Sequence, residues 1–106
     1  MAFYRNIDLG VTGQVVAPRT TKIYWYYIYN AASSVRYVKF YNKATAPSES
    51  DVPVLTIPVP ATSAANVASP VGGFSAGLSL RATTGVADSD TGAPTGNDVV
   101  INLDFA

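Results

Sequence analysis

The chain has 106 residues, with seven Lys and Arg, seven Asp and Glu, and neither His nor Cys. These absences exclude a Ser-His-Asp triad, a Cys-His pair, a His-based zinc site and any disulfide framework, and we expect no enzyme and no cofactor. The balanced charge gives no electrostatic reason to bind nucleic acid or an anionic membrane, so neither is expected as a partner.

The residue types favour an all-β fold. Val, Ile, Thr, Tyr, Phe and Trp account for 40 residues, against 15 for the helix formers Leu, Met, Glu, Gln, Lys and Arg. β-Branched and aromatic side chains suit the pleated, half-buried surface of a sheet. Together with the length, which suits one domain, this predicts a single-domain antiparallel β-sandwich, with a jelly roll as one form of it.

In chain order, residues 1–20 are predicted to form an N-terminal arm or edge strand, and residues 21–106 the β-sandwich domain. The strands are predicted from period-2 alternation and from the turn residues between them. One of them is placed at a sheet edge or a bulge, because Pro53 and Pro58 lack the N–H group that a central strand donates. The predicted strands cover residues 21–30, 35–42, 52–59, 66–68, 77–83 and 98–105.

The strand predicted at 98–105 has the clearest alternation. Its apolar face is predicted to point into the core and consists of Val99, Ile101, Leu103 and Phe105. Its other face is predicted to point outward and consists of Asp98, Val100, Asn102 and Asp104. One apolar and one mainly polar face are typical of a half-buried strand.

The strand predicted at 21–30 is rich in aromatic residues. Alternation sends Trp25, Tyr27 and Tyr29 to one face and Tyr24 and Tyr26 to the other. One set can fill a core, whereas the other must meet a neighbouring chain, a ligand or solvent. Interfaces enrich large aromatic rings with polar tips, and sugars also stack on exposed rings, so both kinds of partner stay open.

Interface residues are predicted on this strand, in the first twenty residues, where two further aromatic residues occur, and in the loop 84–97. The exposed set of the strand is one source, and an N-terminal arm that docks onto a partner is another. The predicted interface residues are Tyr24, Tyr26, Phe3 and Tyr4.

Asp90-Thr91-Gly92-Ala93 matches the signature of retroviral aspartic proteases. That chemistry needs two carboxylates that share a proton across a dimer axis. In that family the motif follows an apolar strand in the first third of the chain, whereas only 14 residues follow Gly92 here. The supporting strand and helix have no room, so no catalytic residue is predicted.

Three acidic residues near this motif are candidate cation ligands: Asp88, Asp90 and Asp98. Carboxylate oxygens on a loop suit a hard cation such as calcium. The spacing does not follow an EF-hand, and Asp is also an ordinary turn residue that accepts hydrogen bonds from its own backbone. The turn interpretation is favoured over a metal site.

The basic residues are scattered along the chain, with Arg36, Lys39 and Arg81 on predicted strands. Tyrosine and arginine together could indicate binding of a single-stranded nucleic acid. Because the net charge is zero, a solvated sheet face or ion pairs between subunits is the favoured interpretation.

Four stretches of the chain have a recognisable pattern, namely NAASSVRYVKFYNKATAP at 30–47, DVPVLTIPVP at 51–60, GFSAGL at 73–78 and TGVADSD at 84–90. Through them the chain from about Tyr24 to Leu103 resembles a group of small structural proteins encoded by tailed bacteriophages. No catalytic residues belong to this pattern.

The resemblance implies a virion component, and specifically a capsid decoration (cement) protein that stabilises the head by binding the major capsid protein. Such a protein would act as a homo-oligomer, for example a trimer, on the surface of the phage head after synthesis in the host cytoplasm. The alternative within the virion is a tail, connector or fibre component. The alternative from another class is a carbohydrate-binding β-sandwich module.

Overall fold

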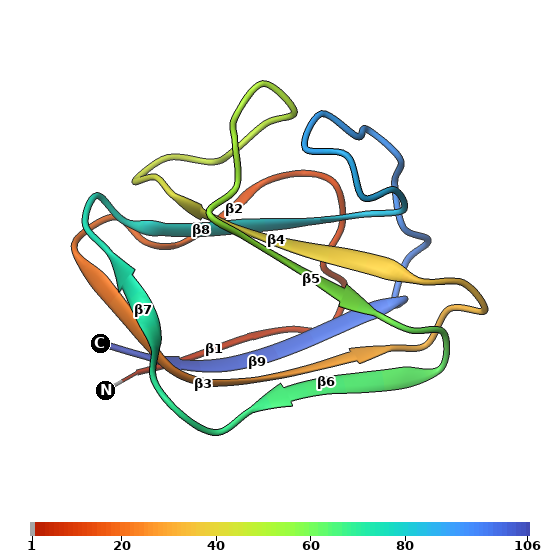
Figure 1. Ribbon diagram of the computed structural model, residues 1–106, viewed down its shortest axis with the longest axis horizontal. Coiled ribbons are helices and arrows are strands. Elements are labelled where there is room, and N and C mark those ends of the chain that lie inside the picture. Colours follow the sequence, from red (N-terminus) through yellow and green to blue (C-terminus); the bar gives the residue numbers. More distant parts are fainter. Residues whose placement is uncertain (1) are drawn as a thin grey trace.

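The computed structural model describes residues 2–106, which form nine β-strands and no helix. Figure 1 shows two sheets packed face to face, with loops extending beyond the upper one. The pairings between strands are antiparallel, which confirms the predicted all-β antiparallel sandwich. The strands are β1 (Ala2–Asn6), β2 (Gln14–Ala17), β3 (Thr21–Asn30), β4 (Arg36–Asn42), β5 (Leu55–Val59), β6 (Ser63–Val67), β7 (Val71–Phe74), β8 (Leu78–Thr83) and β9 (Val99–Phe105).

Both sheets combine strands that are distant in the sequence. The lower sheet in Figure 1, sheet A, has the order β1-β9-β3-β6, and β7 also pairs with β3. The upper sheet, sheet B, has the order β2-β8-β4-β5. From the middle of the chain outward, β4 pairs with β5, β3 with β6 and β7, β2 with β8, and β1 with β9. This nested pairing, in which successive pairs alternate between the sheets, is the connectivity of a jelly roll.

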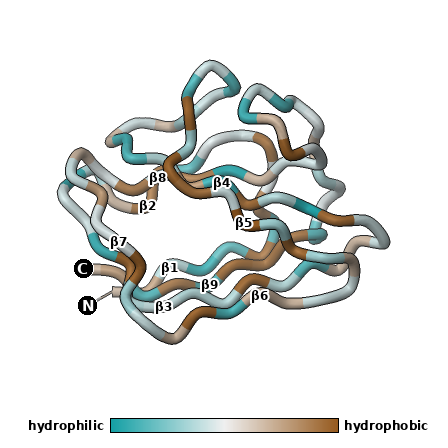
Figure 2. The backbone as a smooth tube through the Cα atoms, in the orientation of Figure 1, coloured by the Kyte–Doolittle hydropathy of each residue, from teal (hydrophilic) through white to brown (hydrophobic). Residues whose placement is uncertain are grey.

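The hydrophobic core lies between the two sheets. Figure 2 shows hydrophobic positions alternating with hydrophilic ones along the strands. The predicted inward face of β9 is confirmed, because Val99, Ile101, Leu103 and Phe105 are buried. Sheet B contributes the buried side chains Val38, Phe40, Leu78, Leu80 and Ala82. Each fully buried large apolar side chain contributes about 1.5–3 kcal/mol to folding.

The first strands are part of the sandwich. β1 lies at the edge of sheet A, where Ala2 pairs with Phe105, and β2 lies at the edge of sheet B beside β8. Of the two alternatives predicted for residues 1–20, the structure shows edge strands, one in each sheet; residue 1 lies outside the described residues. The boundary predicted after residue 20 therefore does not separate two structural units.

β7 is the strand that the sequence pattern does not predict. It contains Gly72 and Gly73, and Gly72 has a φ of 44°. Glycine has low strand propensity, so no alternation marks this segment. Of the edge and the bulge predicted as alternatives from the prolines of segment 52–59, the structure shows the edge, because β5 lies at the edge of sheet B.

Candidate functional site

A β-bulge in β3 decides which aromatic side chains face outward. β3 pairs with β9 through Ile23 and then through Trp25, so Tyr24 is left as an extra residue. Side-chain alternation restarts after a bulge. As a result Ile23 lies in the core before the bulge, and Tyr26 and Ile28 lie in the core after it.

The prediction of Tyr26 as an interface residue is wrong. Its side chain is 6% exposed, and its ring centroid lies 6.1 Å from that of Phe40 in the opposite sheet. Burial raises the pKa of Tyr26, because a low-dielectric core disfavours the charged phenolate. An unbroken alternation would keep Tyr24 and Tyr26 on one outer face, and the bulge separates them.

The other predicted interface residues lie in different surroundings. Tyr24 is half-buried, and the ammonium of Lys22 lies 5.9 Å from the centre of its ring. Tyr4 packs against the core, and its hydroxyl accepts a hydrogen bond of 3.1 Å from the amide of Asn6. Phe3 is 77% exposed. Of the predicted residues, Phe3 alone has a largely exposed ring.

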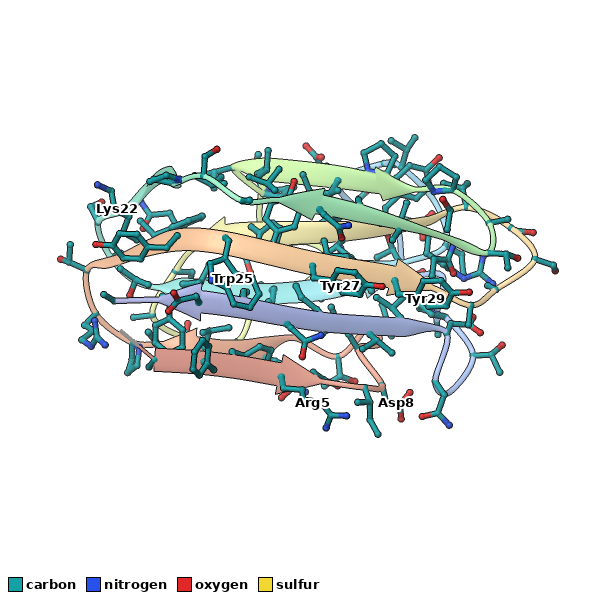
Figure 3. The ribbon with its side chains drawn as sticks, turned by 90° about the horizontal axis from the view of Figure 1, so that it is seen from below. Arg5, Asp8, Lys22, Trp25, Tyr27 and Tyr29 are labelled. Carbon is teal, nitrogen blue, oxygen red and sulfur yellow. The ribbon has the colours of Figure 1, made fainter. Side chains whose placement is uncertain are left out.

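The outer side of sheet A carries a group of aromatic rings that we call the aromatic face, defined by Phe3 of β1 and by Trp25, Tyr27 and Tyr29 of β3. Figure 3 looks onto this face: the three β3 side chains follow one another along the strand, and Arg5 lies to one side on β1. Trp25 and Tyr29 are half-buried, and Tyr27 is 41% exposed. Rings of this kind are enriched at protein interfaces.

Polar side chains from neighbouring strands flank the rings. Across the sheet, Tyr27 lies opposite Asn102 of β9 on one side and Asn66 of β6 on the other. Arg5 of β1 lies opposite Asn102. The β3 sequence alone does not reveal these groups, because the fold brings them in from other strands. The aromatic face therefore combines rings with hydrogen-bonding side chains.

Asp104 lies in the middle of this face, as its predicted outward orientation requires, yet it is 4% exposed. Its neighbours across the sheet are Phe3 and Trp25, whose ring centroids are 6.1 Å apart. Its Oδ1 atom is buried and has no hydrogen-bond partner among residues 2–106. The side chain points outward as predicted, and neighbouring rings shield it from water.

The middle of the outer side of sheet B, on β4 and β8, is covered by the chain itself. Lys39 of β4 and Arg81 of β8 lie opposite each other and are buried beneath the loop that joins β8 to β9 (Figure 1). Arg81 donates hydrogen bonds to the carbonyls of Asp90 (2.9 Å) and Asp88 (3.0 Å) and to the hydroxyl of Tyr41 (2.8 Å). The predicted solvated face is wrong for both cations, because loop carbonyls take the place of water.

Lys39 is held by the same loop. Its ammonium donates to the carbonyl of Ala87 and, at 3.4 Å, to that of Gly85. Burial lowers the pKa of Lys39, and the charge of Arg81 lowers it further, since both disfavour the charged form. Like charges that face each other across a sheet are unfavourable, so this pair depends on the loop that covers it.

The three predicted cation ligands have separate roles. The Asp90 carboxylate accepts hydrogen bonds of 2.7 and 3.2 Å from backbone N–H groups of its own loop, so the Asp-Thr-Gly-Ala motif closes a turn. Asp98 forms an ion pair of 3.2 Å with Arg36, and Asp88 supplies its carbonyl to Arg81. Residues 2–106 contain no cluster of three or more side chains that could hold a metal ion.

Over residues 2–106 the surface has no pocket, and this part of the chain contains no helix long and apolar enough to cross a membrane. Comparison with protein-family models, curated proteins and solved structures finds no match to this chain. The candidate site therefore rests on the geometry of the molecule, which leaves the aromatic face of sheet A open and covers the middle of the outer side of sheet B.

Proposed function

We propose that this chain is a structural protein of a tailed-phage virion, a cement protein that binds the major capsid protein on the outside of the head. The observation that carries the proposal is the difference between the two outer sides. A loop covers the middle of sheet B at Lys39 and Arg81, whereas sheet A leaves Phe3 77% and Tyr27 41% exposed. Exposed aromatic patches mark sites of protein or ligand contact. The sequence resemblance to phage structural proteins is the reason for proposing the phage head as the partner.

A second exposed apolar group lies in the loops beyond sheet B. Val52 and Val54 precede β5, and Val86 lies in the loop between β8 and β9; all three are exposed. Figure 1 places these loops on the side of the molecule away from sheet A. Two separate apolar surfaces suit a subunit that contacts both its own copies and the shell.

Cementing needs no chemistry beyond binding. A protein that binds the assembled shell and not its dissociated subunits stabilises the shell by mass action, by about 2.7 kcal/mol per site at a concentration 100 times the Kd. A preformed jelly roll, in which every strand pairs with at least one neighbour, suits this role because little conformational entropy is lost when it binds.

The location and copy number of the chain in purified particles test the proposal. We expect it on separated heads, in a number comparable with the major capsid protein. We also expect heads stripped of it to lose heat resistance and to regain it when purified protein is added back. A few copies found only in tails or connectors would contradict the cement role and favour the tail, connector or fibre alternative.

A carbohydrate-binding module is the second candidate, because the fold places Asn66 and Asn102 on either side of Tyr27. Rings flanked by amides can stack on a sugar and bind its hydroxyls. Trp25 is the single tryptophan, so its fluorescence reports on the aromatic face directly. A saccharide ligand would shift this fluorescence in the wild type and in Tyr37→Ala, on the opposite sheet, but not in Tyr27→Ala. An unchanged spectrum across a set of oligosaccharides would contradict this function.

A further inference from the structure

Two rings close over Asp104 on the aromatic face. β1 and β3 lie on either side of β9, and neighbouring strands are about 4.8 Å apart, so the backbones that carry Phe3 and Trp25 are separated by about twice that spacing. Their ring centroids are only 6.1 Å apart. The rings therefore lean toward each other above Asp104, which explains why it is 4% exposed.

The carboxylate beneath these rings has no hydrogen-bond partner for its Oδ1 atom among residues 2–106, and this atom is buried. The ion pairs of those residues join Arg36 to Asp98 and Lys43 to Asp51, and neither includes Asp104. A buried, unpaired carboxylate oxygen is costly, and a cationic donor from another molecule would satisfy it.

The same face carries such a donor. Arg5 is exposed on β1, two residues after Phe3, and it belongs to neither of these ion pairs. Lys22 is another base near this face (Figure 3), and its ammonium lies 5.9 Å from the centre of the Tyr24 ring.

The exposed acid beside Arg5 in Figure 3 is Asp8, whose Oδ1 accepts a hydrogen bond from the N–H of Asn97. Asp104 and Arg5 form no ion pair with each other. A buried acid and an exposed guanidinium on one face make it complementary in charge to a copy of itself.

We infer that the aromatic faces of two copies of this chain pack against each other about a two-fold axis, with Arg5 of each copy bound to Asp104 of the other. A two-fold axis in the plane of the interface, midway between these side chains, brings both pairs together at once. The inference rests on the proposed function, because it names a second copy of the chain as a partner of the aromatic face, which the proposed function uses as a contact surface.

The size and composition of the face suit this contact. In the view of Figure 3 the molecule extends over 34 by 18 Å in its Cα atoms. With side chains added, such a face is comparable with the roughly 800 Å² per partner of a standard interface. Aromatic residues and Arg at the centre are typical of the residues that dominate binding. Phe3, on an edge strand and largely exposed, has the freedom to turn aside and admit the guanidinium.

Sedimentation velocity of the purified full chain over a range of concentrations tests the inference. We expect dimers for the wild type, with a Kd that rises at least about tenfold in Arg5→Gln, because removing one partner of a buried pair strongly weakens binding. The matched control is Lys22→Gln, which removes the same charge from the same side of the molecule. It should change the Kd by less than about twofold, because an exposed charge contributes little.

The second variant in the sedimentation experiment is Asp104→Asn. It should weaken the dimer to a similar degree, and the double variant Arg5→Gln/Asp104→Asn should be no weaker than either single variant, since both remove one interaction. If Asp104→Asn fails to fold, the comparison of Arg5→Gln with Lys22→Gln still decides, because both residues are exposed.

Three results would overturn the inference: a wild type that stays monomeric at about 1 mM, where even weak specific contacts form; a trimer; or equal effects of Arg5→Gln and Lys22→Gln. A monomer that still decorates heads would overturn the two-fold contact and leave the proposed function standing. A dimer that depends on Arg5, formed by a chain that is absent from virions, would support the two-fold contact and contradict the proposed function.

Discussion

Arg81 joins the loop over sheet B to the sheet itself, with hydrogen bonds to the carbonyls of Asp88 and Asp90 in the loop and to the hydroxyl of Tyr41 in β4. Arg81→Met would keep the length of the stem and remove the donors. The carbonyls of Asp88 and Asp90 and the hydroxyl of Tyr41 would then lose their buried partner. Hydrogen bonds to charged groups contribute about 1.5–3 kcal/mol each, and Lys39 gains a little from losing a neighbouring charge. We expect the free energy of unfolding, measured by urea denaturation, to fall by about 2–4 kcal/mol.

Arg19→Met is the matched control for this measurement. Arg19 is exposed and donates to the adjacent carbonyl of Thr20. The control should change stability by no more than about 0.5 kcal/mol. Equal losses in the two variants would mean that the charge, and not the hydrogen bonds beneath the loop, accounts for the effect.

Single residues show where sequence reasoning stops. Alternation predicts that Lys39, Arg81 and Asp104 point away from the core, and they do, because orientation is a local property of a strand. Their burial depends on what covers them, which is a distant loop for the two cations and two rings from other strands for Asp104. The signal that the sequence offers is a charged residue at an outward position of a regular strand. This signal does not show whether the charge is exposed to water or buried under another segment.

At the level of elements, the bounds of β3 agree with the prediction to the residue, and Trp25, Tyr27 and Tyr29 share a face as predicted. The predicted common face of Tyr24 and Tyr26 is wrong, because Tyr26 lies in the core. The cause is one extra residue in the pairing with β9. A bulge changes the register for every later side chain, and Tyr24 has no feature that distinguishes it from the tyrosines after it. Aromatic residues on both faces also remove the polarity contrast that would reveal the shift.

A salt bridge and a backbone hydrogen bond to Asp51 hold the long loop between β4 and β5. Lys43 donates a hydrogen bond of 2.8 Å to Asp51, and the N–H of Ser48 donates another of 2.8 Å. The bond from Lys43 holds the pKa of Asp51 below its ordinary value, and the bond from Ser48 adds to this effect. The ionised carboxylate therefore binds better in the folded loop than in the unfolded chain.

The interactions of the ionised Asp51 carboxylate predict that the stability of the fold depends on pH. A lowered folded pKa means that the stabilisation is fully present above the ordinary pKa of Asp and is lost as the pH falls through the lowered one. Asp51→Asn should remove about 0.5–1 kcal/mol at pH 7, because the pair is partly exposed, and should flatten the fall of Tm below about pH 4.

The control for this loop is Glu49→Gln, which neutralises an exposed acid that belongs to neither of the ion pairs described here. Thermal melts from pH 7 to pH 2 compare the three proteins. An acid limb of the same slope in Asp51→Asn and in the wild type would show that the loop does not depend on this carboxylate.

For the whole molecule, the nested pairing predicts cooperative unfolding. Each sheet consists of strands that the other sheet interrupts in sequence, and the core side chains of both face each other. Neither sheet can lose its packing alone, so we expect a two-state transition. Urea curves from Trp25 fluorescence, which reports on sheet A, and from far-UV circular dichroism, which reports on both sheets, should coincide. Separate midpoints would show that the sheets unfold independently.

The nested strand order also determines when sheet A can be completed during synthesis of the chain. β9 is the central strand between β1 and β3, yet a ribosome makes it after every other strand. β1 has to wait for a partner about 100 positions further along the chain, and such long-range pairing is slow to form. Phe3, Asp104 and Trp25 come into register only when β9 is inserted. While the chain is still being translated, the surface on which we propose that copies meet is incomplete, so we expect nascent chains not to associate through it.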